Sequence, residues 1–253
     1  MSKDAEATGI CAHCGAEGVA GRRCTDRACT LKTRHLIPKE HAASGVEPDP
    51  MIGRMLDEHL LVRLIGQGGF GKVYLAIQHP VGLRTAVKLL DLPNMDAAKA
   101  GVALRNVERE ARALAALSHP SIVRLYRYGI FGDQPYLVME YLESARGLDE
   151  EMKDRWRRKD WFPRETARAI LAQLLDGLEA AHTRDIIHRD IKPGNIMLQE
   201  VEGNPLLVRL LDFGLAKDLS QGSLTETVIG TPDYMAPEQI RQLLIGPPTD
   251  LYA

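Results

Sequence analysis

A glycine-rich hexapeptide, GQGGFG at positions 66–71, follows one short apolar segment and precedes another. The second segment alternates Val73, Leu75 and Ile77 at period two, the pattern of a half-buried β-strand. The glycines therefore join two antiparallel strands and do not open a helix, which argues against a dinucleotide-binding βαβ unit. Because glycine lacks a Cβ atom, the backbone N–H groups of such a hairpin can approach phosphate oxygens closely. The sequence thus predicts a phosphate site between two strands.

A third predicted strand, 84–90, carries Lys88 inside an apolar run. Taken alone, Lys88 is explained by an edge position from which its ammonium group reaches water. A helix predicted further on has apolar residues at steps of three and four, and Glu110 lies within that stripe. A carboxylate on an apolar face is costly unless it is paired. We therefore expect Lys88 to pair with Glu110; Glu108 is the competing acid, but it lies off the stripe.

Two polar motifs follow apolar segments in the second half of the chain. HRDIKPGN spans 188–195 after an amphipathic segment, 167–181, and DFG spans 212–214 after a mostly apolar run. Phosphoryl transfer needs positioning and charge neutralisation more than covalent chemistry, and carboxylates, amides and lysines supply both. Any one Asp or Asn is also a common turn cap. The combination, in this order, favours phosphoryl transfer.

Together these motifs resemble the protein kinase family, over about residues 60–253. GxGxxGxV, AVK, a helical Glu110, HRDxKxxN, DFG and APE occur in the order typical of that family. Lys192, two residues after Asp190, and the pair Gly230-Thr231 look like the serine/threonine class, as in the eukaryotic-like kinases of bacteria. The resemblance implies an α+β, two-lobed fold with an antiparallel β N-lobe and a mainly helical, incomplete C-lobe. It also implies transfer of the γ-phosphoryl group of Mg·ATP to protein Ser or Thr hydroxyls.

The resemblance also assigns roles to single residues. Asp190 would orient the substrate hydroxyl, Lys192 would steady the γ-phosphoryl group, and Lys88, fixed by Glu110, would hold the α- and β-phosphates. Asn195 and Asp212 would ligate Mg²⁺. The residues expected to contact the nucleotide are Gly66, Gln67, Gly68, Gly69, Phe70, Gly71, Val73, Ala86, Lys88, Met139, Glu140, Leu142 and Met197.

A polar loop after Asp212 carries several hydroxyl residues. In this family, an arginine before the catalytic aspartate, here Arg189, pairs with a phosphate on that loop and orders it. We expect autophosphorylation at Thr225 and Thr227, with self-association allowing reaction between two copies; ordinary loop hydroxyls are the alternative.

All four cysteines fall within the first 29 residues, as Cys11-x2-Cys14-x9-Cys24-x4-Cys29. Four thiolates at such spacing favour a structural Zn²⁺, which folds loops too small to bury a core. Two disulfides, a redox CxxC and unpaired surface thiols are alternatives, and three histidines are substitute ligands: His13, His35 and His41. We expect a zinc-ribbon-like module at 1–35, tethered as a separate bead by a linker at 36–58. The kinase-like domain then spans 59–253, with an N-lobe at 59–142 and a C-lobe at 143–253.

Composition excludes several other classes of protein. The longest stretches without a charged residue have 11 residues, far short of the roughly 20 that a membrane span needs. The N-terminus lacks an apolar signal segment, so we expect a cytoplasmic protein. The net charge of −2 is spread evenly, which argues against nucleic-acid binding, including by the cysteine module.

The resemblance stops at Ala253, where the family continues with a long buried helix and several more helices. We expect either a fragment of a longer protein or a truncated gene product. Losing that helix would expose apolar surface on the segment with Leu171, Leu174, Leu175 and Leu178 and leave Asp190 poorly supported. A chain of this length would then be weakly active or unstable alone. The rival function is a pseudokinase-like scaffold.

Overall fold

The computed structural model describes residues 8–31, 33–42, 49–69, 71–91, 97–214 and 232–253. The chain divides into two compact units. Unit 1 contains residues 1–91 and 129–141, and unit 2 contains residues 92–128 and 142–253. Strands dominate unit 1 and helices dominate unit 2, so the class is α+β, as the sequence predicts.

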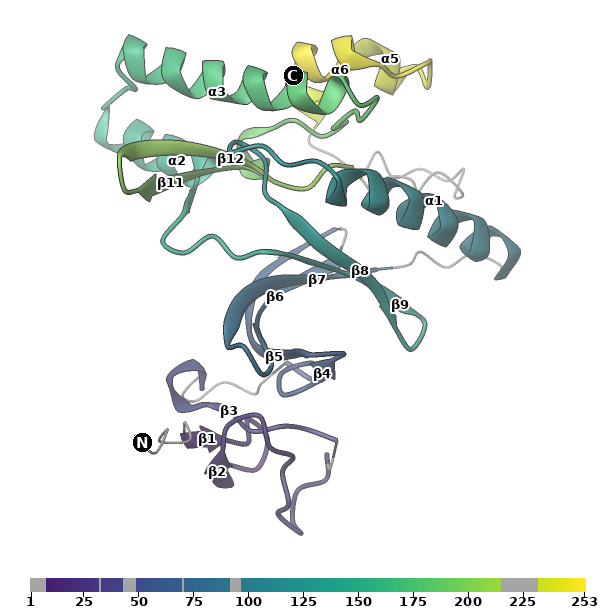
Figure 1. Ribbon diagram of the computed structural model, residues 1–253. Helices are drawn as coiled ribbons and strands as arrows, with labels where there is room; N and C mark the ends of the chain where they lie inside the picture. The colour runs from purple at the N-terminus through teal and green to yellow at the C-terminus, as the bar shows by residue number, and fades with distance from the viewer. Residues whose placement is uncertain (1–7, 32, 43–48, 70, 92–96, 215–231) are drawn as a thin grey trace. The chain divides into compact units, whose positions relative to one another are not determined.

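The main sheet has the strand order β4-β5-β6-β7-β9-β8 (Figure 1). The first five of these strands pair antiparallel along β4-β5-β6-β7-β9, as predicted for the strands that flank the glycine loop. The sixth, β8, crosses from unit 2 into unit 1 along the chain. The strands are β4 (Met55–Leu56), β5 (His59–Gly68), β6 (Gly71–Gln78), β7 (Leu83–Leu90), β8 (Leu125–Phe131) and β9 (Gln134–Glu140).

Each face of this sheet has its own apolar cluster, because successive strand residues point to opposite faces. One cluster consists of the buried side chains of Leu56, Leu61, Tyr74, Ala76, Val87, Leu89, Tyr136 and Val138. The other cluster joins Leu60, Val62 and Leu75 to Ile37, which lies outside the main sheet.

Ile37 belongs to a small three-stranded sheet of order β2-β1-β3 at the N-terminus. Its elements are β1 (Thr8–Ile10), β2 (Glu17–Val19), β3 (Ile37–Pro38) and the 3-10 helix η1 (Lys39–His41). A second, local core gathers around Cys11, Cys24, Cys29 and Leu36. The cysteine module is therefore not a separate bead, because Ile37 and Ile10 pack into the apolar cluster of the main sheet.

The segment 36–58, expected as a linker, contains β3, η1 and β4. Ile37 and Leu56 within it are fully buried. Strands of two residues carry no readable period, which is why the sequence pattern missed them. The domain boundaries drawn from the sequence stay a prediction.

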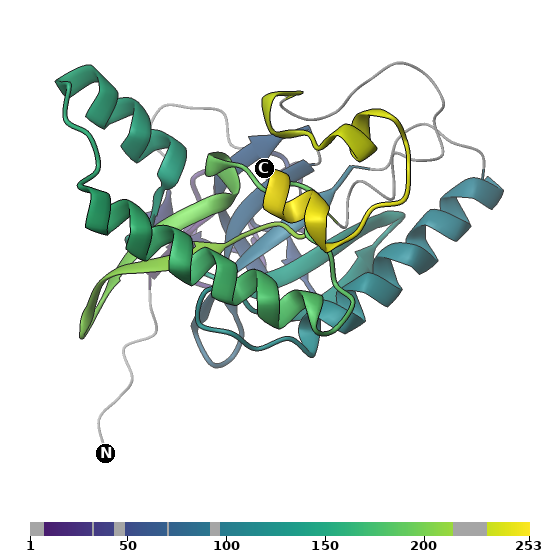
Figure 2. The same cartoon turned by 90° about the horizontal axis from the view of Figure 1, so that it is seen from above.

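Unit 2 is built on a long helix and a β-hairpin, with α3 lying along β12 (Figure 2). Gln173 of α3 joins the two elements, since its Nε2 donates to Leu206 O at 2.9 Å and its Oε1 accepts from Val208 N at 3.2 Å. The elements are α1 (Ala97–Ala115), β10 (Arg146–Gly147), α2 (Leu148–Arg158), α3 (Arg164–His182), η2 (Pro193–Asn195), β11 (Ile196–Val201), β12 (Asn204–Leu210), η3 (Pro232–Tyr234), α5 (Pro237–Ile240) and α6 (Pro247–Tyr252).

The apolar stripe of α3 is only partly covered. Leu174 and Leu178 are buried, whereas Leu171 and Leu175 are 57% and 50% exposed. The expected exposed apolar surface is thus confirmed at two of its four positions. Within the described ranges, the helices are too short or too polar to cross a bilayer.

Candidate active site

Strands β5 and β6 of unit 1 form the two arms of the glycine hairpin. The cross-strand partners are Gly66 with Val73, Gln67 with Lys72, and Gly68 with Gly71. Gly71 has a φ of +128°, and a Cβ atom there would lie 1.9 Å from the Leu89 carbonyl oxygen. A Cβ atom at Gly68 would meet nothing within 4 Å. Gly71 is therefore required by the backbone, whereas the described residues leave the space at the Gly68 Cβ position empty.

Lys88 lies in the middle of β7 and is only 7% exposed. Its cross-strand partners are Val73 on β6 and Leu137 on β9. Two residues before Lys88 on β7, Ala86 pairs with Met139. Directly paired residues share a sheet face, so Val73, Lys88, Ala86 and Met139 lie on one face, as the nucleotide prediction requires. Phe70 lies outside the described residues.

The other predicted nucleotide residues lie at the end of β9 and on β11. Glu140 ends β9 and pairs with Thr85, and Leu142 follows it across the boundary between the units. Met197 belongs to unit 2, on β11, opposite Gly147.

The HRDIKPGN motif of unit 2 brings two predicted residues, Lys192 and Asn195, to the carboxylate of a third, Asp190. Lys192 Nζ lies 2.8 Å from Asp190 Oδ2. Asn195 Nδ2 donates to the same oxygen at 2.8 Å and to the Asp190 carbonyl oxygen at 2.7 Å. Asp190 is thus held by a cation and an amide from its own loop.

Asn195 and Asp212, the predicted Mg²⁺ ligands, come from adjoining segments. Leu211 N donates to the Asn195 carbonyl oxygen at 2.8 Å, which fixes the approach of the residue before Asp212. Because the Asn195 amide nitrogen faces Asp190, its side-chain oxygen is the atom that would bind a cation. A carboxylate and an amide oxygen suit Mg²⁺, which prefers hard oxygen ligands, so the donor set fits the ion.

Asp250, in α6, supports the HRDIKPGN motif and lies 62 residues after His188. Its carboxylate is buried and accepts the backbone N–H groups of His188 at 2.8 Å and Arg189 at 2.7 Å. His182 Nε2 lies 2.8 Å from the same carboxylate. The expectation that Asp190 lacks support is therefore wrong, because its loop is anchored through its two preceding residues.

His188 is buried in an orientation that fixes its proton. Its Nε2 donates to the Leu211 carbonyl oxygen at 2.6 Å, and its Nδ1 accepts the Asp190 N–H at 3.2 Å. Burial lowers the pKa of this imidazole. Its ring also contacts Phe213, with centroids 4.7 Å apart.

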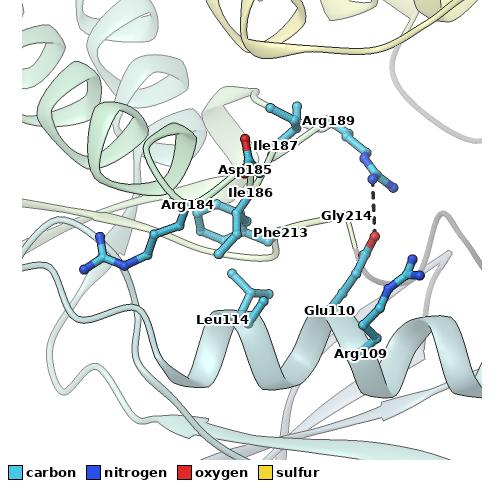
Figure 3. Close-up of a pocket in the computed structure, with 11 residues that line it drawn as sticks. Arg109, Glu110, Leu114, Arg184, Asp185, Ile186, Ile187, Arg189, Phe213 and Gly214 are labelled. Carbon is cyan, nitrogen blue, oxygen red and sulfur yellow. Dashed lines mark ion pairs between the residues drawn. The ribbon is translucent and has the colours of Figure 1, made fainter.

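A cavity of about 300 Å³ lies in unit 2 between α1 and the two motifs (Figure 3). Glu110 points from α1 toward Arg189, and their charged groups are 3.2 Å apart. Leu114, one helical turn on, points toward Phe213. The sequence predicts that Glu110 pairs with Lys88 and that Arg189 pairs with a phosphate on the loop after Asp212. Lys88 belongs to the other unit, so the Lys88–Glu110 pair stays a prediction, as do Thr225 and Thr227, which lie outside the described residues.

The four thiols form a compact cluster in unit 1. Cys11 Sγ lies 3.9 Å from Cys29 Sγ, and Cys14 Sγ lies 3.6 Å from Cys24 Sγ. A tetrahedral Zn²⁺ with bonds of about 2.3 Å separates its sulfurs by about 3.8 Å, so the cluster fits this ion. Among the His, Cys, Asp and Glu side chains of the described residues, these four cysteines form the group that is close enough to hold a metal ion. No histidine belongs to that group.

The thiols differ in acidity without a metal. Burial raises the pKa of Cys14 to about 12, and burial also raises the pKa of Cys24. Burial opposes ionisation of Cys11 as well, but hydrogen bonds from the backbone N–H groups of Cys14 and His13 outweigh it and lower that pKa. A bound cation would favour the thiolate forms of Cys14 and Cys24 against the effect of burial.

The family model described as "Protein kinase domain" matches residues 60–253. This chain belongs to the protein kinase family. The resemblance drawn from its motifs is thereby confirmed, and unit 1 and unit 2 of this kinase carry the two halves of the family's motif set.

Bacterial relatives of the kinase are named serine/threonine-protein kinases. It is 36% identical over 218 residues to Pkn1 of Myxococcus xanthus, covering 81% of this chain and 29% of the relative. It is 35% identical over 206 residues to PrkC of Bacillus subtilis, covering 80% of this chain and 30% of the relative. The kinase chain thus spans less than a third of the length of these relatives.

A crystal structure of the Mycobacterium tuberculosis PknI kinase domain is similar to the kinase chain. The TM-score is 0.62 at 27% sequence identity, and the match covers 80% of this chain and 71% of that one. The likeness confirms the kinase fold.

Two contacts of the kinase were missed by sequence reasoning. The pairing of Glu110 with Arg189 joins residues 79 positions apart, and nothing in either local pattern indicates it. The second is the contact of Asp250 with the backbone of His188. The segment around Asp250 is too short to show a hydrophobic period, so only its likeness to the protein kinase family could have indicated that this acid is buried.

Proposed function

We propose that the chain is a serine/threonine protein kinase, which transfers the γ-phosphoryl group of Mg·ATP to protein Ser or Thr hydroxyls. The observation that carries the proposal is the arrangement around Asp190. A carboxylate held by Lys192 and Asn195 of its own loop is positioned before any substrate arrives. Positioning of this kind is the main contribution of a protein to phosphoryl transfer.

In this proposal Asp190 accepts a hydrogen bond from the substrate hydroxyl and receives its proton as the oxygen attacks phosphorus. Lys192, now 2.8 Å from Asp190, neutralises charge that develops on the transferred group. Bound Mg²⁺ would neutralise charge on the phosphate oxygens. Asn195 and Asp212 would hold that ion through their side-chain oxygens.

The nucleotide is assigned to the face of the main sheet that carries Val73, Ala86 and Met139. Backbone groups near Glu140 and Leu142 would meet the adenine edge, and Lys88 would meet the phosphates. Lys88 is nearly buried, so its ammonium group is partly desolvated and its attraction to phosphate is stronger than at an exposed site. The glycine hairpin would lie over the phosphates.

Regulation by phosphate is assigned to Arg189. A phosphate on Thr225 or Thr227 would compete with Glu110 for the guanidinium group, which now lies 3.2 Å from that carboxylate. A doubly charged phosphate binds arginine more strongly than a carboxylate does, so phosphorylation would release Glu110. Two copies of the chain would phosphorylate one another. The four cysteines would hold a structural Zn²⁺.

The test of catalysis is the Asp190→Asn variant. We expect transfer to casein to fall by a factor of about 10² or more, because the loop loses its proton acceptor. Binding of a non-hydrolysable ATP analogue should change little. Titration calorimetry measures the binding, and mass spectrometry measures phosphate on the substrate and on Thr225 and Thr227.

Asp160→Asn is the matched control, because that carboxylate is exposed and, among the residues that the structure describes, pairs with Arg155 alone. It should transfer phosphate at the parent rate. Parent-level transfer by Asp190→Asn would contradict the assignment of the catalytic residue.

A further inference from the structure

The cysteine module and the predicted nucleotide face share one side of strand β6. Val73 is the predicted nucleotide residue, and Leu75 and Ile77 follow at period two, which places them on the same face. Leu75 and Ile77 pack in the cluster that contains Ile37 of β3. The module thus covers the continuation of the surface on which the nucleotide is expected.

The module also reaches the segment that follows β9. Tyr141, between Glu140 and Leu142, is half-buried against the same cluster as Ile37. Ile10 of β1 packs there as well. Two predicted nucleotide elements of unit 1, β6 and the end of β9, are therefore in contact with one apolar cluster supplied in part by the module.

Backbone hydrogen bonds connect the cysteine cluster to strand β5. Cys24 N donates to Arg34 O at 2.9 Å, and the next residue, His35, donates its N–H to Gly53 O at 2.7 Å. Gly53 N in turn donates to Leu61 O at 2.8 Å, within β5. Gly53 has a φ of +80°, and a Cβ atom there would lie 2.9 Å from His35 O, so this close approach needs glycine.

The segment 49–53, which we call the strap, is also bonded directly to β6 through Asp49. Asp49 Oδ2 lies 2.7 Å from Lys72 Nζ, and Asp49 Oδ1 accepts the hydroxyl of buried Tyr74 at 2.9 Å. Burial opposes ionisation of Asp49, but hydrogen bonds led by that from Lys72 outweigh it and lower its pKa. Lys72 is the cross-strand partner of Gln67, inside the glycine hairpin.

A bound metal ion would stabilise the cysteine module, from which these contacts lead to β5 and β6. The module's local core is little more than the cysteines with Leu36, too small to hold a fold by burial alone. All four cysteines are free of disulfides, so a cation is the cross-link that their geometry allows.

We propose that Zn²⁺ in the four-cysteine site orders the strap and, through Asp49, the glycine hairpin, so that nucleotide affinity depends on the metal. The proposal rests on the proposed function for the identity of the nucleotide. Its structural half, metal-dependent order of the hairpin, stands without it.

The experiment compares the full chain loaded with one equivalent of Zn²⁺ and the same chain stripped by a chelator under reducing conditions. Hydrogen exchange of peptides covering 66–78 reports hairpin order, and calorimetry reports the affinity for a non-hydrolysable ATP analogue with Mg²⁺. We expect faster exchange and about tenfold weaker binding in the stripped chain, within the range usual for coupling between two sites.

Two variants separate coupling from general damage. Asp49→Asn should keep its zinc but show the loosened hairpin and weakened nucleotide binding of the stripped chain, because the Lys72 ion pair is lost. Glu17→Gln is the control, since its carboxylate is exposed and, within the described part of the chain, its ion pair is with Lys39 on the module's own surface. It should match the parent in zinc content, exchange and affinity.

Each outcome decides one part. Failure to bind zinc, or unchanged exchange after zinc is removed, overturns the coupling even if phosphate transfer is normal. Metal-dependent exchange in a chain that binds no nucleotide would support the coupling and contradict the proposed kinase function.

Discussion

At the scale of single residues, the proton on His188 is fixed by its neighbours. A ring nitrogen that accepts the Asp190 N–H carries no proton, so the imidazole is neutral in the folded chain. Burial lowers the pKa of His188, and it also lowers the pKa of His35 and His41 in unit 1. An unfolded chain would protonate all three near the ordinary histidine value of 6.5.

Stability should therefore fall as the pH drops below about 6.5, since the unfolded state then binds more protons than the folded state. Each such histidine contributes up to about 1.4 kcal/mol per pH unit. Urea unfolding at pH 7.5 and 5.5 measures the difference, and the carboxylates contribute little in this window. An NMR titration that showed His188 ionising near pH 6.5 in the folded chain would contradict the assignment.

At the scale of elements, α3 offers an internal comparison between its covered and uncovered leucines. Leu174→Ala should lower the free energy of unfolding by about 2–5 kcal/mol, because it removes a buried side chain and leaves a cavity. Leu171→Ala should change it by less than about 0.5 kcal/mol, because that side chain is 57% exposed. Leucine and alanine have similar helix propensities, so the difference between the two variants in urea denaturation measures the effect of burial. Equal losses would mean that Leu171 is covered in solution.

The elements with a clear period could be predicted, and the short ones could not. Alternation at Val73, Leu75 and Ile77 indicated β6, and a stripe at steps of three and four indicated α1. The pair Ile37–Pro38 has no period, although β3 joins the module to the main sheet. Its burial follows from tertiary contact alone, which a local pattern does not record.

At the scale of the whole molecule, nucleotide binding should raise the thermal stability of the chain. At a concentration about 100 times the Kd, a ligand that binds only the folded state adds about 2.7 kcal/mol. For a chain of this size that corresponds to a rise in Tm of about 5–10 °C. Differential scanning fluorimetry with Mg²⁺ and a non-hydrolysable ATP analogue measures it.

Two variants make this measurement specific. Lys88→Met should lose most of the rise, because it removes the cation expected on the phosphates. Asp190→Asn should keep it, because Asp190 acts on the substrate hydroxyl. A full rise in Lys88→Met would contradict the predicted role of Lys88.

The candidate site was predictable to the extent that its residues lie in continuous motifs. Asp190, Lys192 and Asn195 fall within six residues, and the structure brings them together. Contacts across long separations, such as Asp250 with His188, depend on how separate elements pack. The Glu110–Arg189 pair depends on the same packing, so no local sequence pattern indicated it.

The two ends of the glycine hairpin also carry different evolutionary information. A side chain at position 71 would collide with the Leu89 carbonyl oxygen, so selection for a folded sheet preserves Gly71 whether or not a nucleotide binds. At position 68 no atom of the described residues would lie within 4 Å of a Cβ atom, so an occupant over the hairpin is what would oppose a side chain there. Among diverged copies of this gene, drift at position 68 would record the loss of nucleotide binding, whereas a retained Gly71 would not testify to activity.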